Sequence, residues 1–354
     1  MKALRFHKAH DLRLEDVPAP RDPRPGDVIV KVSHAGICGT DLHEYESGPI
    51  ILPVGPHPVT GAKIPLILGH EFSATVTAVG SAVRSVKVGD RVAIIPHLNK
   101  QGEYYARRNL GQFSAETGLV GLTWHWGGMA EYALVPEPNV VRLPDSVTDE
   151  QGAVVEPALV ALNAIDNAGV CVGSTVLVTG AGPIGALTAL CAQAAGAAAI
   201  YVFEPNPGRR ARIEALGGFR VFGDREALMA DIAENTDSGV GVDFAIECAG
   251  HEAALGLCVE AVKRTGTIAQ VGLFVGKPSV DMYRICEKGI RLIGCWGNDI
   301  TAGPRLVGMI ASGRFPVEKV ITGRVTLETA VSSGFDALTR RGNDHLKILI
   351  KVAA

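Results

Sequence analysis

The sequence has few cysteines, and they do not form a pattern that would support a disulfide framework. Its 354 residues contain seven, of which only Cys38 precedes residue 171. Scattered thiols are typical of proteins kept in a reducing compartment, so we expect a cytoplasmic protein. Lys2, Arg5 and Lys8 interrupt the first residues, and this pattern does not predict a secretory signal peptide.

An excess of charge of either sign is also missing. The formal net charge is -3 and the pI is about 6.4, which argues against a basic surface for nucleic acid or for anionic lipid. The longest apolar run, residues 186–203, contains Gln193 and Gly196. It falls where a buried helix followed by a buried strand is expected, so we do not interpret it as a membrane span.

The length of the chain predicts two domains, because it exceeds what one ordinary core accommodates. The first part contains short β-branched or alternating segments at 28–32, 73–79 and 91–95, separated by glycine and proline. This pattern predicts a compact, barrel-like β domain. The proline-rich segment 48–65 reads as a long, stiff loop. It is interpreted either as a wall of the substrate pocket or as a passive surface loop.

From residue 175 onward, strand and helix patterns alternate. Near-continuous apolar strands spaced by helices predict a parallel sheet covered on both faces, as in a doubly wound α/β domain. A final strand at 346–352 is expected to return to the first domain. The predicted division is therefore 1–156 with 297–354 for the catalytic domain, and 157–296 for the nucleotide-binding domain. The strands are expected at 175–179, 199–203, 219–222, 242–247, 267–271 and 290–294, and helices at 183–195, 209–216 and 304–312.

A glycine fingerprint connects the first of these strands to its helix. Gly180 permits a tight turn, Gly182 lets the backbone approach a pyrophosphate, and Gly185 allows close helix packing. Pro183 and Ile184 open the helix, whose free N–H groups would meet the phosphates. The alternative is a merely structural turn. The strand before the motif and the helix after it favour dinucleotide binding.

An acidic residue, Glu204, ends the second strand. It would accept hydrogen bonds from the adenosine ribose and repel a 2′-phosphate, which favours NAD over NADP. Arg209 and Arg210 follow, and guanidinium groups can hold a phosphate. We interpret Arg209 as a ribose or adenine contact, with a solvated helix face as the alternative. Leu273 comes just after a strand, at the sheet edge where ligands gather, and is expected to face nicotinamide or substrate.

Four potential metal ligands precede the glycine fingerprint: Cys38, His70, Glu71 and Glu156. Each has an ordinary explanation by itself, as a packed core residue or a solvated carboxylate. Together, one thiolate, one imidazole and two carboxylates are a donor set for zinc. A single zinc with an open coordination position beside a nicotinamide would move hydride to and from an alcohol carbon.

With these motifs the chain resembles the zinc-dependent medium-chain alcohol and polyol dehydrogenases over essentially its full length. The resemblance implies a GroES-like catalytic domain and a Rossmann NAD-binding domain. Residues 43–49 and the long loop before Gly69 are most similar to the butanediol dehydrogenase branch, with polyol and threonine dehydrogenases as near neighbours. The resemblance rests on residues 36–41, 43, 69–71, 89–92 and 156–157 and on the glycine fingerprint.

The resemblance also implies how the zinc is held. Cys38, His70 and Glu156 would bind it, and Glu71 would lie beside it as an alternating or outer ligand. Asp41 would steady one of the ligands, a position where substitution usually weakens metal affinity. The fourth coordination position would be left for water or for the substrate oxygen.

Thr40 and His43 resemble the proton relay of the family. The Thr40 hydroxyl would touch the substrate oxygen, the cofactor ribose would bridge, and His43 would exchange the proton with solvent. The alternatives are a turn hydroxyl and a histidine on a helix surface. Trp124, Trp126 and Trp296 are interpreted first as core or interface residues and only second as pocket residues.

Many relatives carry a lobe of four cysteines that binds a second, structural zinc. The corresponding region here, after residue 95, has no cysteine, and His97, Glu103 and Glu116 are too scattered to replace the lobe. We expect one catalytic zinc per subunit and no structural zinc. We also expect a homodimer or homotetramer, although the missing lobe leaves the subunit contacts open.

The main hypothesis is an NAD-dependent zinc dehydrogenase of a small secondary alcohol or vicinal diol, such as 2,3-butanediol with acetoin as product. The carboxylate Glu156 resembles a polyol-type site more than a simple-alcohol site. A sorbitol-like polyol dehydrogenase and a threonine dehydrogenase stay open as alternatives. So do a zinc-free quinone or enoyl reductase and a non-catalytic nucleotide-binding protein of the same fold.

Overall fold

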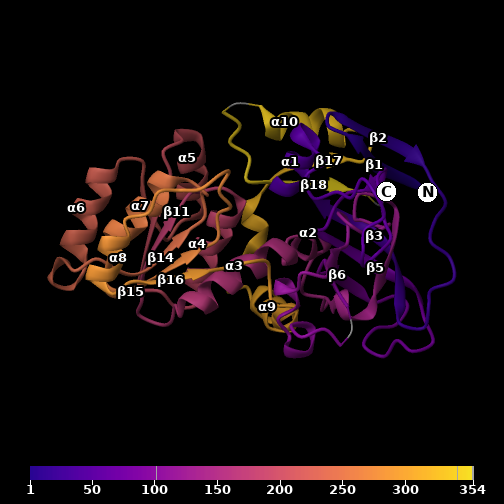
Figure 1. Ribbon diagram of the computed structural model, residues 1–354, viewed down its shortest axis with the longest axis horizontal. Coiled ribbons are helices and arrows are strands. Elements are labelled where there is room, and N and C mark those ends of the chain that lie inside the picture. The colour runs from indigo at the N-terminus through magenta and orange to yellow at the C-terminus, as the bar shows by residue number, and fades with distance from the viewer. Residues whose placement is uncertain (101, 341, 353–354) are drawn as a thin grey trace. The chain divides into compact units, whose positions relative to one another are not determined.

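The computed structural model describes residues 1–100, 102–340 and 342–352, and the chain divides into two compact units (Figure 1). The first contains Met1–Glu156, Asp299–Gly313 and Ile321–Ala354, and the second contains Pro157–Asn298 and Arg314–Val320. Residues 297–298 and 314–320 therefore belong with the second unit, whereas the sequence placed them with the first. The side-chain amide of Asn163 donates a hydrogen bond to the carbonyl of Gly297. The 3₁₀ turn η6 (Val317–Val320) packs against α4 (Pro183–Ala194), and Lys319 donates a hydrogen bond to the carbonyl of Leu216.

The first unit is built on a mainly antiparallel sheet. Its strand order is β10-β6-β5-β3-β18-β17, and β9 also pairs with β3. Strand β3 (Asp27–Gly36) is the centre, with Val28, Val30 and Val32 fully buried on its core face. Their period of two explains why this segment forms a strand with one face in the core. The other strands of this sheet are β5 (Phe72–Val79), β6 (Arg91–Ile94), β9 (Tyr132–Pro136), β10 (Val140–Arg142), β17 (Ile321–Thr326) and β18 (Lys347–Lys351).

Smaller elements surround this sheet. A second sheet has the order β2-β1-β4, and β7 pairs with β8. Among the helices, α1 follows β3 directly, and the last strand, β18, pairs antiparallel with β3. The bounds are β1 (Lys2–Lys8), β2 (Asp11–Asp16), β4 (Leu66–Ile67), β7 (His97–Asn99), β8 (Thr117–Leu119), α1 (Gly39–Ser47), α2 (Asp149–Ala153), α9 (Gly303–Ala311) and α10 (Asp336–Thr339). Helix α3 (Val155–Ala168) begins in this unit, but from Pro157 onward it belongs to the second unit.

The second unit is a doubly wound α/β domain. Its parallel sheet has the order β13-β12-β11-β14-β15-β16, so the chain winds outward from β11 in one direction and then from β14 in the other. Leu177, Tyr201 and Ile268 are buried in its core. The elements are β11 (Thr175–Thr179), β12 (Ala199–Phe203), β13 (Arg220–Phe222), β14 (Val242–Glu247), β15 (Val262–Gln270), β16 (Arg291–Gly294), α4, α5 (Pro207–Leu216), α6 (Arg225–Asn235), α7 (Glu252–Ala261) and α8 (Met282–Lys288).

The apolar run at 186–203 is divided between α4 and β12, as the sequence predicted. Among the helices that the structure describes, none is both long and apolar enough for a membrane crossing. The proline-rich loop is held at its start by Glu44 of α1. The carboxylate of Glu44 is buried and accepts hydrogen bonds from the backbone N–H groups of Ile50 (2.9 Å) and Ile51 (2.5 Å).

Candidate metal centre and nucleotide-binding site

Strand pairing in the first unit brings Cys38 next to His70 and Glu71. Strands β3 and β5 run antiparallel, and Ala35 of β3 pairs with Phe72 of β5. The chain leaving β3 therefore meets the chain entering β5, and the Gly36 N–H donates to the Glu71 carbonyl at 2.7 Å. Residues just after one strand and just before its antiparallel neighbour must lie side by side.

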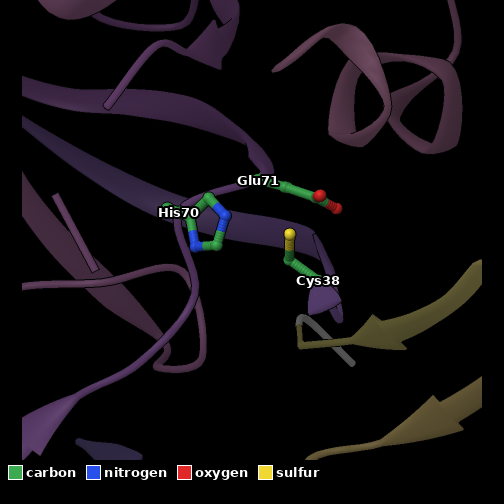
Figure 2. A group of neighbouring side chains, drawn as sticks. All are labelled: Cys38, His70 and Glu71. Atoms are coloured by element: carbon green, nitrogen blue, oxygen red, sulfur yellow. The ribbon is translucent and has the colours of Figure 1, made fainter. Parts of the chain in front are cut away.

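The side chains of these three residues converge (Figure 2). The Cys38 sulfur lies between the His70 ring and the Glu71 carboxylate in this view, and one ligand atom from each lies within 4.8 Å of the others. Donors around one zinc ion are separated by roughly 3.5 Å, given its bond lengths of about 2.0–2.3 Å. Small side-chain adjustments would therefore let all three reach one ion. Thiolate, imidazole and carboxylate fit zinc in kind as well.

Asp41 connects the backbone of Cys38 with the ring of His70. Its Oδ2 accepts a hydrogen bond from the Cys38 N–H at 3.0 Å, which fixes Cys38 at the start of α1. Its Oδ1 lies 3.6 Å from His70 Nδ1, an ion-pair distance that is too long for a hydrogen bond. Burial alone would lower the pKa of His70, but the charges of Asp41 and Cys38 raise this pKa well above its ordinary value. The Asp41 carboxylate thus favours a positive charge on this side of the centre.

Glu71 already has a cationic partner, Lys347, which the sequence did not single out. The Lys347 ammonium donates to both oxygens of Glu71, at 2.9 and 2.6 Å, and to the carbonyl of Ile37 at 3.1 Å. Both side chains are at most 2% exposed. Burial alone would lower the pKa of Lys347, but the negative charges of Glu71 and Cys38 raise it. The only local signal was a lysine beside three consecutive apolar residues at the start of the last strand.

The other predicted residues of this centre lie at different places. Glu156 is 7% exposed in the first turn of α3 and is outside the group of three donors, so its role as a ligand stays a prediction. The Thr40 hydroxyl is 3.9 Å from the Cys38 sulfur. His43 is exposed, three residues further along α1. Residues three apart share one helix face, so Thr40 and His43 run from the centre toward solvent.

The glycine fingerprint of the second unit forms the turn between β11 and α4. Gly180 has φ 89°, and a Cβ on Gly185 would lie 1.8 Å from the Gly180 carbonyl oxygen. Both positions therefore require glycine. Gly182 is the N-cap of α4, and Pro183 and Ile184 follow in the first turn. The N–H groups of this turn have no partner within the helix, so they are oriented to receive a phosphate.

Glu204 and Arg209 lie next to this turn. The Glu204 carboxylate is 5% exposed and accepts hydrogen bonds from the N–H groups of Ala181 (2.8 Å) and Asn206 (2.9 Å). A ribose contact would therefore use its remaining lone pairs. Arg209 Nε is buried and has no hydrogen-bond partner among the residues that the structure describes. Arg210 instead donates to the carbonyls of Glu204 and Pro205.

The apolar candidates differ in exposure. Leu273 is 65% exposed, three residues after β15 ends, and Trp296 is 51% exposed. Trp124 and Trp126 are partly buried against the core of the first unit, and Trp124 Nε1 donates to the carbonyl of Leu134. Trp124 thus acts as a core residue.

A cavity of about 850 Å³ lies elsewhere in the second unit, between α7 and α8. None of the predicted site residues lines it. Basic side chains are prominent in its wall, but Arg264 and Arg284 both pair with Glu287, and Arg225 pairs with Glu260. Since these three arginines already form ion pairs, they offer no unpaired positive charge to a ligand in the cavity.

Comparisons with known proteins agree with this geometry. The family model described as "Alcohol dehydrogenase GroES-like domain" matches residues 24–145, and the model "Zinc-binding dehydrogenase" matches residues 183–312. The (R,R)-butanediol dehydrogenase of Bacillus subtilis (strain 168) is 37% identical, covering 99% of each chain. The sorbitol dehydrogenase of Gallus gallus is 32% identical, covering 99% of this chain and 96% of the relative. The crystal structure of 2R,3R-butanediol dehydrogenase from Bacillus subtilis has a TM-score of 0.91 at 35% identity, covering 99% of each chain.

A zinc-type donor cluster in one unit and a dinucleotide turn in the other define an oxidoreductase that uses zinc and a nicotinamide cofactor. More narrowly, the chain belongs to the zinc-binding alcohol dehydrogenase family. The predicted family and the predicted α/β fold, with a GroES-like and a Rossmann-type domain, are confirmed.

Gly36→Ala should destabilise the zinc-free protein. A Cβ at this position would lie 2.2 Å from Glu71 Oε2, so the carboxylate must shift against Lys347. Overpacking of this kind costs about 1–3 kcal/mol of folding free energy. Gly39→Ala is the matched control, because its Cβ would meet nothing within 4 Å. Urea unfolding of the chelated protein measures both variants, and equal stabilities would contradict the close packing described here.

Lys347→Met should destabilise the zinc-free protein, because it leaves Glu71 buried without a counter-charge. Removing one partner of a buried ion pair costs about 3–5 kcal/mol. Lys351→Met is the control, since Lys351 is exposed on the same strand and should change stability by about 0.5 kcal/mol or less. Urea unfolding of the chelated protein measures the difference in the free energy of unfolding between the two variants. Added zinc should make this difference smaller. A Lys347 variant as stable as the control would be inconsistent with the ion pair.

Proposed function

We propose that the chain is an NAD-dependent zinc dehydrogenase of a small secondary alcohol or vicinal diol, with 2,3-butanediol and acetoin as the substrate pair. The observation that carries this proposal is the convergence of Cys38, His70 and Glu71. Zinc at such a centre supplies Lewis acidity that lowers the pKa of an alcohol hydroxyl, and the nicotinamide takes or gives the hydride.

The residues of the chain bind the ion, balance its charge and move the proton. Cys38 and His70 would hold the ion, with Glu71 or Glu156 as the third ligand. The contacts of Lys347 favour Glu156 as the third ligand, because Glu71 would have to give up its hydrogen bonds from the Lys347 ammonium in order to coordinate the ion. Thr40, close to the Cys38 sulfur, would take the hydroxyl proton, and exposed His43 would pass it to solvent.

The diol is favoured by the names of the relatives. Two (R,R)-butanediol dehydrogenases match at 37% and 32% identity over nearly the whole chain. Sorbitol dehydrogenases match at 32%, so a longer polyol is the second candidate. Both candidate substrates carry a hydroxyl on the carbon next to the reacting one, and they differ in the length of their carbon chains.

NAD is favoured over NADP by the charge next to the glycine turn. The buried Glu204 carboxylate would repel a 2′-phosphate, while Arg209, with its unpartnered Nε, would contact the ribose or adenine. Leu273 at the sheet edge would cover the nicotinamide. We place the enzyme in the cytoplasm as a homodimer or homotetramer, on the grounds of its scattered thiols and its family.

A panel of diols and alcohols tests the function, run with NAD and NADP on zinc-loaded and chelated enzyme. We expect the highest kcat/KM for 2,3-butanediol with NAD. Cys38→Ser and His70→Ala should lower kcat by about a thousandfold or more, because several kcal/mol of transition-state stabilisation come from the ion. NADH binding should stay nearly unchanged. Cys171→Ser, an exposed thiol, is the control. Near-normal kcat in either ligand variant would refute the assignment, and higher kcat/KM with sorbitol would favour the second candidate.

We also propose one zinc per subunit. In the region that would carry a structural zinc, Glu116 pairs with Lys100 at 2.7 Å, and Glu103 accepts the N–H groups of Tyr105 and Ala106. These carboxylates thus have other partners. Metal analysis of the purified protein should give about one zinc per chain, in keeping with a single three-ligand catalytic site. A second tightly bound zinc would overturn this proposal.

A further inference from the structure

A buried carboxylate in the second unit has no part in the functions described so far. Glu247 is the last residue of β14 and is fully buried. No lysine, arginine or histidine side chain in the described part of the chain lies within ion-pair distance of it. A buried charge without a counter-ion is costly unless hydrogen bonds satisfy it. The partners of Glu247 therefore show what the charge is used for.

Those partners are N–H donors from two loops. Oε1 accepts the backbone N–H groups of Ala249 and Gly250, both at 2.9 Å. Oε2 accepts the Gly250 N–H at 3.1 Å and the side-chain amide of Gln270 at 2.5 Å. The carbonyl of Glu247 also accepts the N–H groups of Val271 and Gly272, each at 2.9 Å. One residue thus ties the loop after β14 to the loop after β15.

The orientation of Gln270 is set by this arrangement. Its Nε2 faces two groups that can only accept, the Glu247 carboxylate and the carbonyl of Gly272 at 2.8 Å. Its Oε1 is buried and has no partner within the described residues. The carboxylate therefore fixes the Gln270 side chain at the end of β15.

Glu247 lies where a doubly wound sheet binds its ligand. It pairs in register with Thr179, the last residue of β11 before the glycine turn. Strand β11 leads to β12 and β13 on one side, and β14 leads to β15 and β16 on the other. The carboxyl ends of β11 and β14 thus flank the switch point, across which a dinucleotide extends. The loop after β14 also touches the glycine turn, since a Cβ on Gly180 would lie 3.0 Å from Ala249.

We propose that Glu247 is a positioning residue for the nicotinamide half of the cofactor. The glycine turn and Glu204 serve the adenosine and pyrophosphate half, on the β11–β12 side. The loops at 248–250 and 271–273, on the β14–β15 side, are left for the nicotinamide half, and the Glu247 carboxylate holds both in shape. This proposal rests on the proposed use of NAD, and it adds a residue that does not itself touch the cofactor.

Replacement by glutamine separates charge from size. All partners of the two carboxylate oxygens are donors, so a carboxamide NH₂ in either position would face an N–H group. Glu247→Gln should therefore release one of the loops without leaving a cavity. Gln270→Met removes one donor from the same carboxylate and introduces no new donor, so it should have a smaller effect in the same direction.

Asp243 provides a matched control on the same strand. It lies at the opposite end of β14, where its Oδ2 accepts the N–H and the hydroxyl of Thr175, both at 2.8 Å. It also pairs with Lys263. Asp243→Asn should loosen the sheet at its amino end and leave the carboxyl end intact.

The experiment compares two ligands on the full-length, zinc-loaded protein. NADH binding is followed by fluorescence, and ADP-ribose, which lacks the nicotinamide, by calorimetry. Glu247→Gln should weaken NADH by about tenfold or more, because a buried donor or acceptor is left unsatisfied. Its affinity for ADP-ribose should stay nearly that of the unaltered protein. Asp243→Asn should change neither affinity, although it lowers the midpoint of thermal unfolding.

Equal loss of NADH and ADP-ribose affinity in Glu247→Gln would overturn the proposal, since it would indicate general loosening of the unit. Unchanged NADH affinity would overturn it as well. Should Glu247→Gln fail to fold, Gln270→Met decides by the same two affinities. The readout is binding, so a protein that binds NADH but oxidises none of the diols would refute the proposed substrate and leave this test intact. A protein that does not bind NADH would refute both.

Discussion

The pairing of β3 with β5 is the constraint on which the metal centre depends. Antiparallel register places Ala35 opposite Phe72, and this brings Cys38 next to His70 and Glu71. A slip of one residue would turn every side chain of the strand to the other face. The valines of β3 are buried on one side, so their burial holds the register and, with it, the donor geometry. Packing of the core thus sets the position of the chemistry.

The buried carboxylates of the two units are stabilised in different ways. Glu71 has the ammonium of Lys347, and Asp41 has the Cys38 N–H together with the nearby ring of His70. Glu204 and Glu247 depend on backbone N–H groups, to which Glu247 adds one side-chain amide. At the metal centre one cation, Lys347, lies where Cys38 and the buried carboxylates of Asp41 and Glu71 meet. In the nucleotide-binding unit, backbone N–H groups of the turns stabilise the buried carboxylates instead, and the same hydrogen bonds fix the shape of the loops.

Much of this architecture could be predicted from sequence because its signals are local. The strand predicted at 175–179 has the observed bounds, since an apolar run between a polar segment and a glycine turn leaves little choice. Cys38, His70 and Glu71 stood out because each lies in a short motif of recognisable chemistry. The helix predicted at 183–195 is one residue shorter in the structure, which is the usual uncertainty at a frayed end.

The parts that were missed depend on contacts between distant segments. Lys347 is 276 residues from Glu71, and the residues next to it in the sequence do not predict the ion pair. Glu247 looked like the end of a strand, because its partners are N–H groups that exist only once the turns form. Residues 314–320 were placed with the wrong unit for the same reason, since their partner is α4.

The ion pair of Lys347 also sets an order of assembly during synthesis. At about 5–20 residues per second, a ribosome needs roughly 15–55 s to add the 276 residues between Glu71 and its cation. The buried ion pair and the pairing of β18 with β3 form only after the last strand has emerged, so the first unit cannot be completed before then.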